Sequence, residues 1–130
     1  MEVSELMHSD PHAVGVDTNI SEAARLMKET GANCLVVMRD QRVEGIITDR
    51  DMALGCLVDG HVSWKCQVYK HMTLQRQTVS PGLHFGDASV MMIDRDIDHL
   101  PVLEEGQLVG LISSAQLFQA IDREMATMAV

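Results

Sequence analysis

The chain has 130 residues, of which 46% are hydrophobic and 22% charged, and its formal net charge is −9. This composition is that of a soluble globular protein, and the length fits one domain or two half-domains that share a core. The acidic balance argues against a nucleic-acid partner, which would require clustered Lys and Arg. No apolar run approaches the roughly 18 residues of a membrane span, and the start lacks the order of a signal peptide. We therefore expect a cytoplasmic protein with no membrane partner.

Residue patterns in the first half of the chain predict its elements in order. Residues 1–13 form a lead-in that packs on the core, and a short strand follows. Capping residues at positions 17–19 precede a helix over residues 21–29, whose apolar side chains recur at intervals of three and four. Continuous apolar runs predict buried strands over residues 34–38 and 43–47, joined by a polar turn.

The second half of the chain repeats the first half. Adding 65 to each residue number maps the run Gly45-Ile46-Ile47-Thr48 onto Gly110-Leu111-Ile112-Ser113, without a gap. The same offset maps Met27 onto Met92. A constant offset of this kind indicates a tandem duplication of one supersecondary unit.

Each copy reads as β-α-β-β-α with a short first strand, so the predicted fold class is α+β. The elements predicted for the second copy are a helix over residues 86–95, strands over 97–103 and 107–112, and a last helix from Ser113 that frays over 124–130. We place the first repeat at residues 1–60, a linker at 61–71 and the second repeat at 72–130. Because units of about 60 residues are marginal alone, we expect the two repeats to form one compact module.

The run that ends the first copy's second long strand carries the strongest functional signal. If the chain turns into a helix near Thr48, this residue caps the helix and Asp51 ends its first turn. Backbone N–H groups at a helix start suit an anionic group such as phosphate, and a carboxylate one turn in suits the two hydroxyls of a ribose. An ordinary capping arrangement has the same pattern. Arg50 in this turn could bind a phosphate, or it could pair with Asp49 or Asp51 at the surface.

Metal sites and catalysis receive little support from the sequence. Asp94 to Glu105 copies the acidic spacing of an EF-hand loop, but His99 stands where that loop needs glycine, and the repeat predicts a strand there. His61, Cys66 and His71 lie five residues apart, a poor spacing for zinc, so we interpret them as ordinary loop residues. We expect no metal, no cofactor and no catalytic residue, because no nucleophile is accompanied by a recognisable base.

Three runs of residues together resemble a known family. They are the repeated Gly-apolar-apolar-Thr/Ser strand end, Met72-Thr73 ahead of Thr78-Val79-Ser80-Pro81, and the run His99-Leu100-Pro101-Val102. With the β-α-β-β-α repeat, this resembles a tandem pair of CBS domains, also called a Bateman module, over almost the whole chain. The resemblance implies a pseudo-twofold pair whose sheets pack face to face and leave two clefts that often hold adenosine nucleotides.

Carried over residue by residue, the resemblance implies one competent cleft and one weaker cleft. The competent cleft would be formed by Ile46, Ile47, Thr48, Arg50, Asp51, Ile97, Asp98, His99 and Pro101. In the second cleft Gln116 and Ala115 stand at the positions of Asp51 and Arg50, so the charged acceptor and the cation are both missing. That weaker cleft would lie around Asn33, Cys34, Ser113 and Gln116.

The expected function is therefore that of a non-catalytic regulatory module. It would bind a small adenosyl ligand (AMP, ADP, ATP, NAD or S-adenosylmethionine) and signal its presence to an effector protein that the sequence does not identify. The resemblance also implies a homodimer. The alternative is a structural or dimerisation module that binds no ligand and associates through methionine-rich helices.

Overall fold

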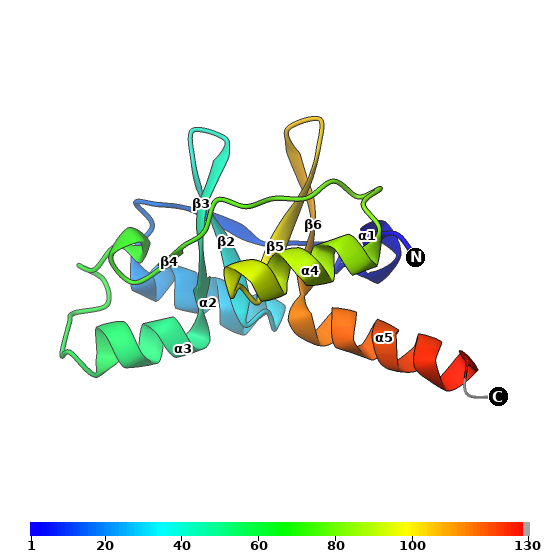
Figure 1. Cartoon of the computed structure of the whole chain (residues 1–130). Helices are drawn as coiled ribbons and strands as arrows, with labels where there is room; N and C mark the ends of the chain where they lie inside the picture. Colours follow the sequence, from blue (N-terminus) through cyan, green and yellow to red (C-terminus); the bar gives the residue numbers. More distant parts are fainter. Residues whose placement is uncertain (129–130) are drawn as a thin grey trace. The chain divides into compact units, whose positions relative to one another are not determined.

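The computed structural model describes residues 1–128 (Figure 1). In chain order the helices and strands are α1 (Val3–Leu6), β1 (Ala13–Gly15), α2 (Ile20–Thr30), β2 (Cys34–Arg39), β3 (Arg42–Thr48), α3 (Asp49–Asp51), the π-helical turn η1 (Met52–Leu57), the 3-10 turn η2 (Val68–Lys70), β4 (Thr73–Leu74), α4 (Phe85–Arg95), β5 (His99–Glu104), β6 (Gln107–Ser113) and α5 (Ser114–Met128). The chain divides into two compact units. The first-copy unit is His12–Arg76, and the second-copy unit is the chain from Gln77 onward together with Met1–Pro11.

The first-copy unit contains a four-stranded sheet in the order β1-β2-β3-β4. β1 runs parallel to β2, and the other neighbours are antiparallel. Asn19 caps the start of helix α2, because its side chain accepts a hydrogen bond from the Glu22 N–H at 2.9 Å. Gly31, with φ 77°, caps the end of the helix. Buried residues on α2, the sheet, η1 and the segment after η1 form one core: Val16, Ile20, Ala23, Met27, Leu35, Val37, Ile47, Met52, Cys56, Cys66 and Val68.

The second-copy unit repeats this architecture on the β5–β6 hairpin, with α4 and α5 contributing to its core. Its first strand is reduced to a single parallel bridge between Val79 and Val102. The two long hairpins share a register irregularity at equivalent places, Val37/Met38 and Val102/Leu103. The α+β fold and the tandem repeat predicted from the sequence are therefore confirmed.

The segment that leads into each copy, called its lead-in, packs in the unit of the other copy. These lead-ins are Met1–Pro11 for the first copy and residues 72–76 for the second. Val3 of α1 is fully buried in the core of the second-copy unit, whereas Met72 packs against the core of the first-copy unit. His8 bridges β6, and β4, which follows Met72, pairs with β3. The boundaries of the compact units therefore differ from the repeat boundaries predicted from the sequence. The segment 61–71 belongs to the first-copy unit.

This packing of each lead-in in the other copy's unit bears on Gly45 and Gly110, the glycines at equivalent positions of the two copies. A Cβ at Gly45 would collide with the Thr73 carbonyl oxygen and the Met72 side chain. A Cβ at Gly110 would collide with Met7, the residue equivalent to Met72. At Gly45 glycine is needed because the backbone of the other copy's lead-in crosses there, whereas at Gly110 the closest contact is with the flexible Met7 side chain.

Two element boundaries differ from the sequence prediction by more than one residue. Strand β5 begins at His99 instead of residue 97, because Asp96, with φ 52°, ends α4 in the left-handed region and a connection follows. Helix α5 continues to Met128 instead of fraying from residue 124, and residues 129–130 lie outside the described part of the chain. Between residues 1 and 128, the length and apolar character that a bilayer-spanning helix needs are not found together in any helix.

Candidate functional site

The Thr48 turn forms a reciprocal cap at the end of β3. The Thr48 hydroxyl accepts a hydrogen bond from the Asp51 N–H at 3.1 Å, and the Asp51 carboxylate accepts one from the Thr48 N–H at 2.9 Å. This is the capping arrangement that the sequence left open. It does not exclude binding, because a carboxylate has a second oxygen and further lone pairs to offer.

Arg50 lies on the exposed side of the same turn. Its guanidinium forms no ion pair with any residue between 1 and 128, so the surface pair with Asp49 or Asp51 that the sequence left open is not formed. The Asp49 carboxylate instead accepts a hydrogen bond from the Arg50 backbone N–H at 2.8 Å. The turn therefore carries an exposed cation at the position before Asp51.

Strand β2 supplies the floor beside this turn. Cys34 pairs with Thr48 across β2 and β3, and the Asn33 carbonyl accepts a hydrogen bond from the Asp49 N–H at 3.2 Å. Burial raises the pKa of Cys34 to about 12, and the nearby Asp51 and Asp49 carboxylates add to the rise. The Cys34 thiol is therefore neutral, and it can offer only weak hydrogen bonds to a ligand.

The two isoleucines before Thr48 have different roles. Ile47 is fully buried and belongs to the core of the first-copy unit, so its side chain supports the turn from below. Ile46 is also buried, but successive strand residues point to opposite faces, and it lies outside that core cluster.

The equivalent turn of the second-copy unit keeps the geometry but loses the charge. The Gln116 side-chain oxygen accepts a hydrogen bond from the Ser113 N–H at 2.8 Å, and the Ser113 hydroxyl accepts one from the Gln116 N–H at 3.3 Å. The Asp98 carbonyl accepts a hydrogen bond from the Ser114 N–H at 2.9 Å, as Asn33 does for Asp49. The amide thus reproduces the cap of Asp51 without its negative charge.

The remaining residues assigned to the competent cleft also lie in the second-copy unit. His99 is half-buried and pairs with Ser113, and Pro101 is fully buried on β5. Ile97 and Asp98 precede that strand. The structure thus places the predicted residues in two half-sites, one at the same end of each hairpin. The acidic run from Asp94 to Glu105 extends from α4 through β5, so its side chains do not form a calcium loop.

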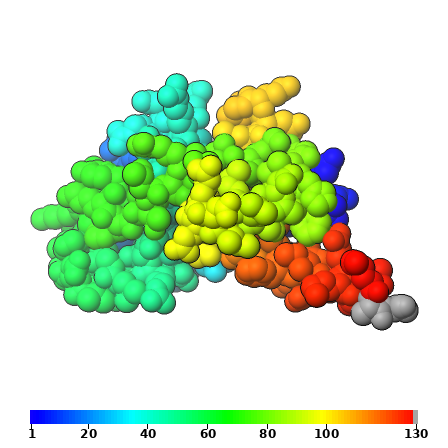
Figure 2. All heavy atoms as spheres, viewed as in Figure 1, coloured from blue at the N-terminus to red at the C-terminus, as the bar shows by residue number. Residues whose placement is uncertain are grey.

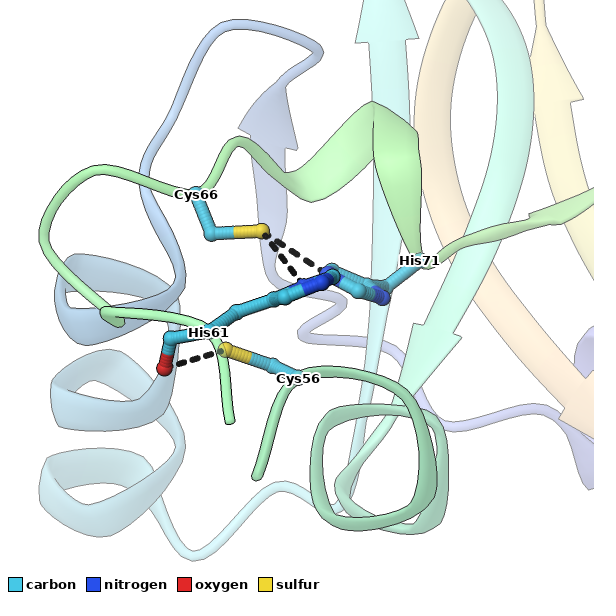
Figure 3. Close-up of side chains that lie close together, drawn as sticks. All are labelled: Cys56, His61, Cys66 and His71. Atoms are coloured by element: carbon cyan, nitrogen blue, oxygen red, sulfur yellow. Dashed lines mark hydrogen bonds between the residues drawn. The ribbon is translucent and has the colours of Figure 1, made fainter. Parts of the chain in front are cut away.

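A second group of side chains comes together in the first-copy unit (Figure 3). Cys56 on η1, His61 and Cys66 in the following segment, and His71 after η2 each offer one ligand atom, and these four atoms lie within 4.8 Å of one another. The sequence interpretation treated the last three as ordinary loop residues and omitted Cys56. Positions 56, 61, 66 and 71 form a series at a constant interval of five, which is the signal that could have found the group.

The environment of Cys56 and His71 raises the pKa of the thiol and lowers that of the imidazole, so it favours the neutral form of each. Burial raises the pKa of the Cys56 thiol, and the adjacent Cys66 and Asp59 add to the rise. Desolvation lowers the pKa of His71, and the neighbouring His61 ring lowers it further, against smaller opposing effects of Asp59 and Asp51. Thiols and imidazoles gathered in this way are the ligand types that borderline and soft metal ions prefer.

The duplicated β-α-β-β-α fold, with a capped turn at the same end of each hairpin, defines a tandem-repeat α+β module. Its family follows from comparison with known proteins. The sequence profile of the CBS domain matches residues 3–55 and 68–123. The chain belongs to the CBS domain family, and it is a tandem CBS pair.

Individual relatives agree with this assignment. The chain is 29% identical over 115 residues to the CBS domain-containing protein YhcV of Bacillus subtilis, covering 88% of this chain and 81% of that protein. The CBS domain pair of protein MJ0100, in complex with 5-methylthioadenosine and S-adenosyl-L-methionine, has a TM-score of 0.78 at 21% identity over 95% of this chain and 98% of that chain. Hypoxic Response Protein I with two coordinated zinc ions has a TM-score of 0.75 at 22% identity over 92% and 98%. At such identities these two structures show the shared fold.

Proposed function

We propose that this CBS pair is a non-catalytic regulatory module that binds an adenosyl ligand at the Thr48 turn. The observation that carries the proposal is that one turn contains both the Asp51 carboxylate and the Arg50 guanidinium. The guanidinium forms no ion pair with residues 1–128. The carboxylate suits ribose hydroxyls, and the guanidinium suits a phosphate or another anionic group. The adenosyl compounds bound by MJ0100 support this ligand class.

The proposal assigns different strengths to the two half-sites. Gln116 keeps the cap but not the charge, and Ala115 supplies no cation. A nucleotide phosphate would gain a charge-assisted hydrogen bond at Arg50 alone, so the competent half-site is the one built on Thr48, Arg50 and Asp51. Ligand binding there would bias the module toward one arrangement and pass the signal to an effector protein.

A thermal-shift screen against AMP, ADP, ATP, NAD and S-adenosylmethionine tests the proposal. Because a ligand that binds only the folded state stabilises it by mass action, the native chain should show a dose-dependent rise in Tm with at least one compound. The variant Arg50→Gln should lose most of the rise for phosphate-containing ligands. If no compound at millimolar concentration shifts the Tm, the module does not have this function.

We also propose that the module is a homodimer, because an apolar surface surrounds η1. Leu57 and Val58 are 76% and 69% exposed, and Trp64 is 67% exposed. Beside them lies a hollow of about 620 Å³ lined mainly by apolar side chains, including Met27, Met52 and Val62. Figure 2 shows the segment that follows η1 (green) at the surface. Large exposed apolar patches of this kind mark protein interfaces.

A further inference from the structure

We propose that Cys56, His61, Cys66 and His71 form a structural zinc site. The ligand atoms are the two Sγ atoms, Nδ1 of His61 and Nε2 of His71. The site lies wholly within the first-copy unit, and it is independent of the adenosyl ligand proposed for the Thr48 turn.

Among Cys66, His61 and His71, two of the three distances between ligand atoms fit the edges of a tetrahedron around zinc, and Sγ of Cys56 lies within 4.8 Å of all three. Zn–N bonds of about 2.0–2.1 Å and Zn–S bonds of about 2.3 Å give tetrahedral edges of about 3.3–3.8 Å. Nδ1 of His61 lies 3.3 Å from Nε2 of His71 and 3.7 Å from Sγ of Cys66. Sγ of Cys66 lies 2.8 Å from Nε2 of His71, so this one edge must lengthen when an ion enters.

The donor set favours zinc over Ca²⁺ and Mg²⁺. Two thiolates and two imidazoles form a Cys₂His₂ set, which contains no carboxylate or carbonyl ligand of the kind that Ca²⁺ and Mg²⁺ require. Four protein ligands fill a tetrahedral site and leave no open position for a water or a substrate. The site is therefore structural and not catalytic.

The surrounding backbone holds these ligands in place. The Cys66 carbonyl accepts a hydrogen bond from the Ile20 N–H at 2.8 Å, which fixes it to the start of α2. The Cys56 carbonyl accepts one from the His61 N–H at 3.0 Å. Both cysteines are buried in the core, at 3% and 6% exposure. The frame is thus largely organised before an ion binds, which lowers the cost of assembling the site.

Gly55 makes room for the fourth ligand. A Cβ at this position would lie 2.5 Å from Nδ1 of His71 and 3.3 Å from its Cγ. Because any side chain there would displace the ring, glycine allows His71 to approach η1 closely enough to join Cys56. The ion would then cross-link η1 to the segment 61–71, which otherwise contains only the short turn η2.

The test is metal binding by the full chain and four variants. Cys56→Ser/Cys66→Ser removes both sulfur ligands, and His61→Gln removes an exposed ligand, so we expect this variant to keep the fold. Gly55→Ala keeps all four ligands but displaces the His71 ring. Cys34→Ala is the matched control, because it removes the buried thiol that lies outside the group.

The native chain and Cys34→Ala should contain about one zinc ion per chain when purified, measured by elemental analysis. After treatment with a chelator, titration with Co²⁺ should produce the visible absorption of a tetrahedral site and a sulfur-to-metal charge-transfer band. His61→Gln and the double variant should bind Zn²⁺ more than about 100-fold more weakly, beyond the usual effect of residues that only orient a ligand. Gly55→Ala should also bind Zn²⁺ more weakly than the native chain does.

Two results of the Zn²⁺-binding measurements would overturn the proposal. One is a native chain that binds no more Zn²⁺ than the double variant, as expected if the four side chains only pack together or if the cysteines form a disulfide. The other is a His61→Gln chain, folded by circular dichroism, that binds Zn²⁺ as tightly as the native chain. A Co²⁺ complex without the charge-transfer band would equally exclude the cysteine ligands.

Discussion

At the scale of single residues, Asp51 has an observed structural role and a proposed role in ligand binding. Its carboxylate caps the Thr48 N–H, and its charge is the feature that Gln116 lacks in the other copy. The two roles can be separated because asparagine keeps an oxygen for the cap but carries no charge, whereas alanine keeps neither.

We predict that Asp51→Asn unfolds at nearly the native Tm, whereas Asp51→Ala loses about 1 kcal/mol of stability with the cap. Both variants should bind ribose-containing ligands more weakly, by about 1–3 kcal/mol, because each loses the charged acceptor. Thermal unfolding and ligand titration measure the two effects side by side. If Asp51→Asn binds as the native chain does, the carboxylate is only a cap.

Cys34 provides a prediction of pH dependence at the same scale. Its pKa is raised from 9.0 to about 12 in the folded chain by burial, with smaller effects of Asp51 and Asp49. The unfolded chain therefore loses the thiol proton first as pH rises, so this group's contribution to stability is complete below pH 9 and declines between pH 9 and pH 12.

Chemical denaturation at pH 8, 9, 10 and 11 should show this decline. Native stability should fall more steeply above pH 9 than that of Cys34→Ala, by up to about 1.4 kcal/mol per pH unit. Groups that titrate in both chains cancel in the comparison. Parallel curves would show that the Cys34 thiol ionises equally easily in the folded and unfolded states.

At the scale of elements, the close crossing of β3 by the other copy's lead-in depends on Gly45. We predict that Gly45→Ala destabilises the chain by about 1–3 kcal/mol, the usual effect of overpacking, because the new methyl group meets backbone that cannot rotate away. Gly82→Ala is the matched control, because a Cβ there meets nothing within 4 Å. Denaturant midpoints of the two variants decide the matter, and equal midpoints would contradict the crossing.

The elements also show what the sequence could and could not predict. The constant offset predicted the repeat, and the Thr48 and Ser113 caps followed from a local pattern that needs no tertiary information. The exchange of lead-ins was not predictable in this way, because an offset maps Met7 onto Met72 without saying which core either side chain enters. The exchange of lead-ins is evident only from the contacts that Gly45 and Gly110 make in the structure.

The cysteine and histidine group was missed for a related physical reason. Local ligand spacings such as Cys-x-x-Cys arise when a tight turn brings two ligands together. Here Cys56 lies near the end of the π-helical turn η1, and a hydrogen bond from the Ile20 N–H of α2 holds Cys66 in place, so tertiary contacts instead of local turns bring the side chains together. A single spacing of five residues carries no such information, and only the full series of positions 56, 61, 66 and 71 could have indicated the group.

At the scale of the whole molecule, the proposed homodimer predicts that the η1 surface is buried on association. Replacing Leu57 and Val58 by Asp should give a monomer by light scattering, because charges in an apolar interface are costly. Ile93→Asp is the control, since Ile93 is 69% exposed but lies on α4. A native chain that is already monomeric, or a dimer that tolerates both charges, would exclude this surface as the interface.

The central claim is that one half-site binds an adenosyl ligand through Arg50 and Asp51, whereas its equivalent at Ala115 and Gln116 is weak. Isothermal titration of the native chain with the most stabilising phosphate-containing ligand of the thermal screen tests this most directly, beside Arg50→Gln and Gln116→Ala. We predict one tight site per chain, which Arg50→Gln weakens by about 1–3 kcal/mol and Gln116→Ala leaves nearly unchanged. Two equal sites, or a tight site that depends on Gln116 and not on Arg50, would contradict the account.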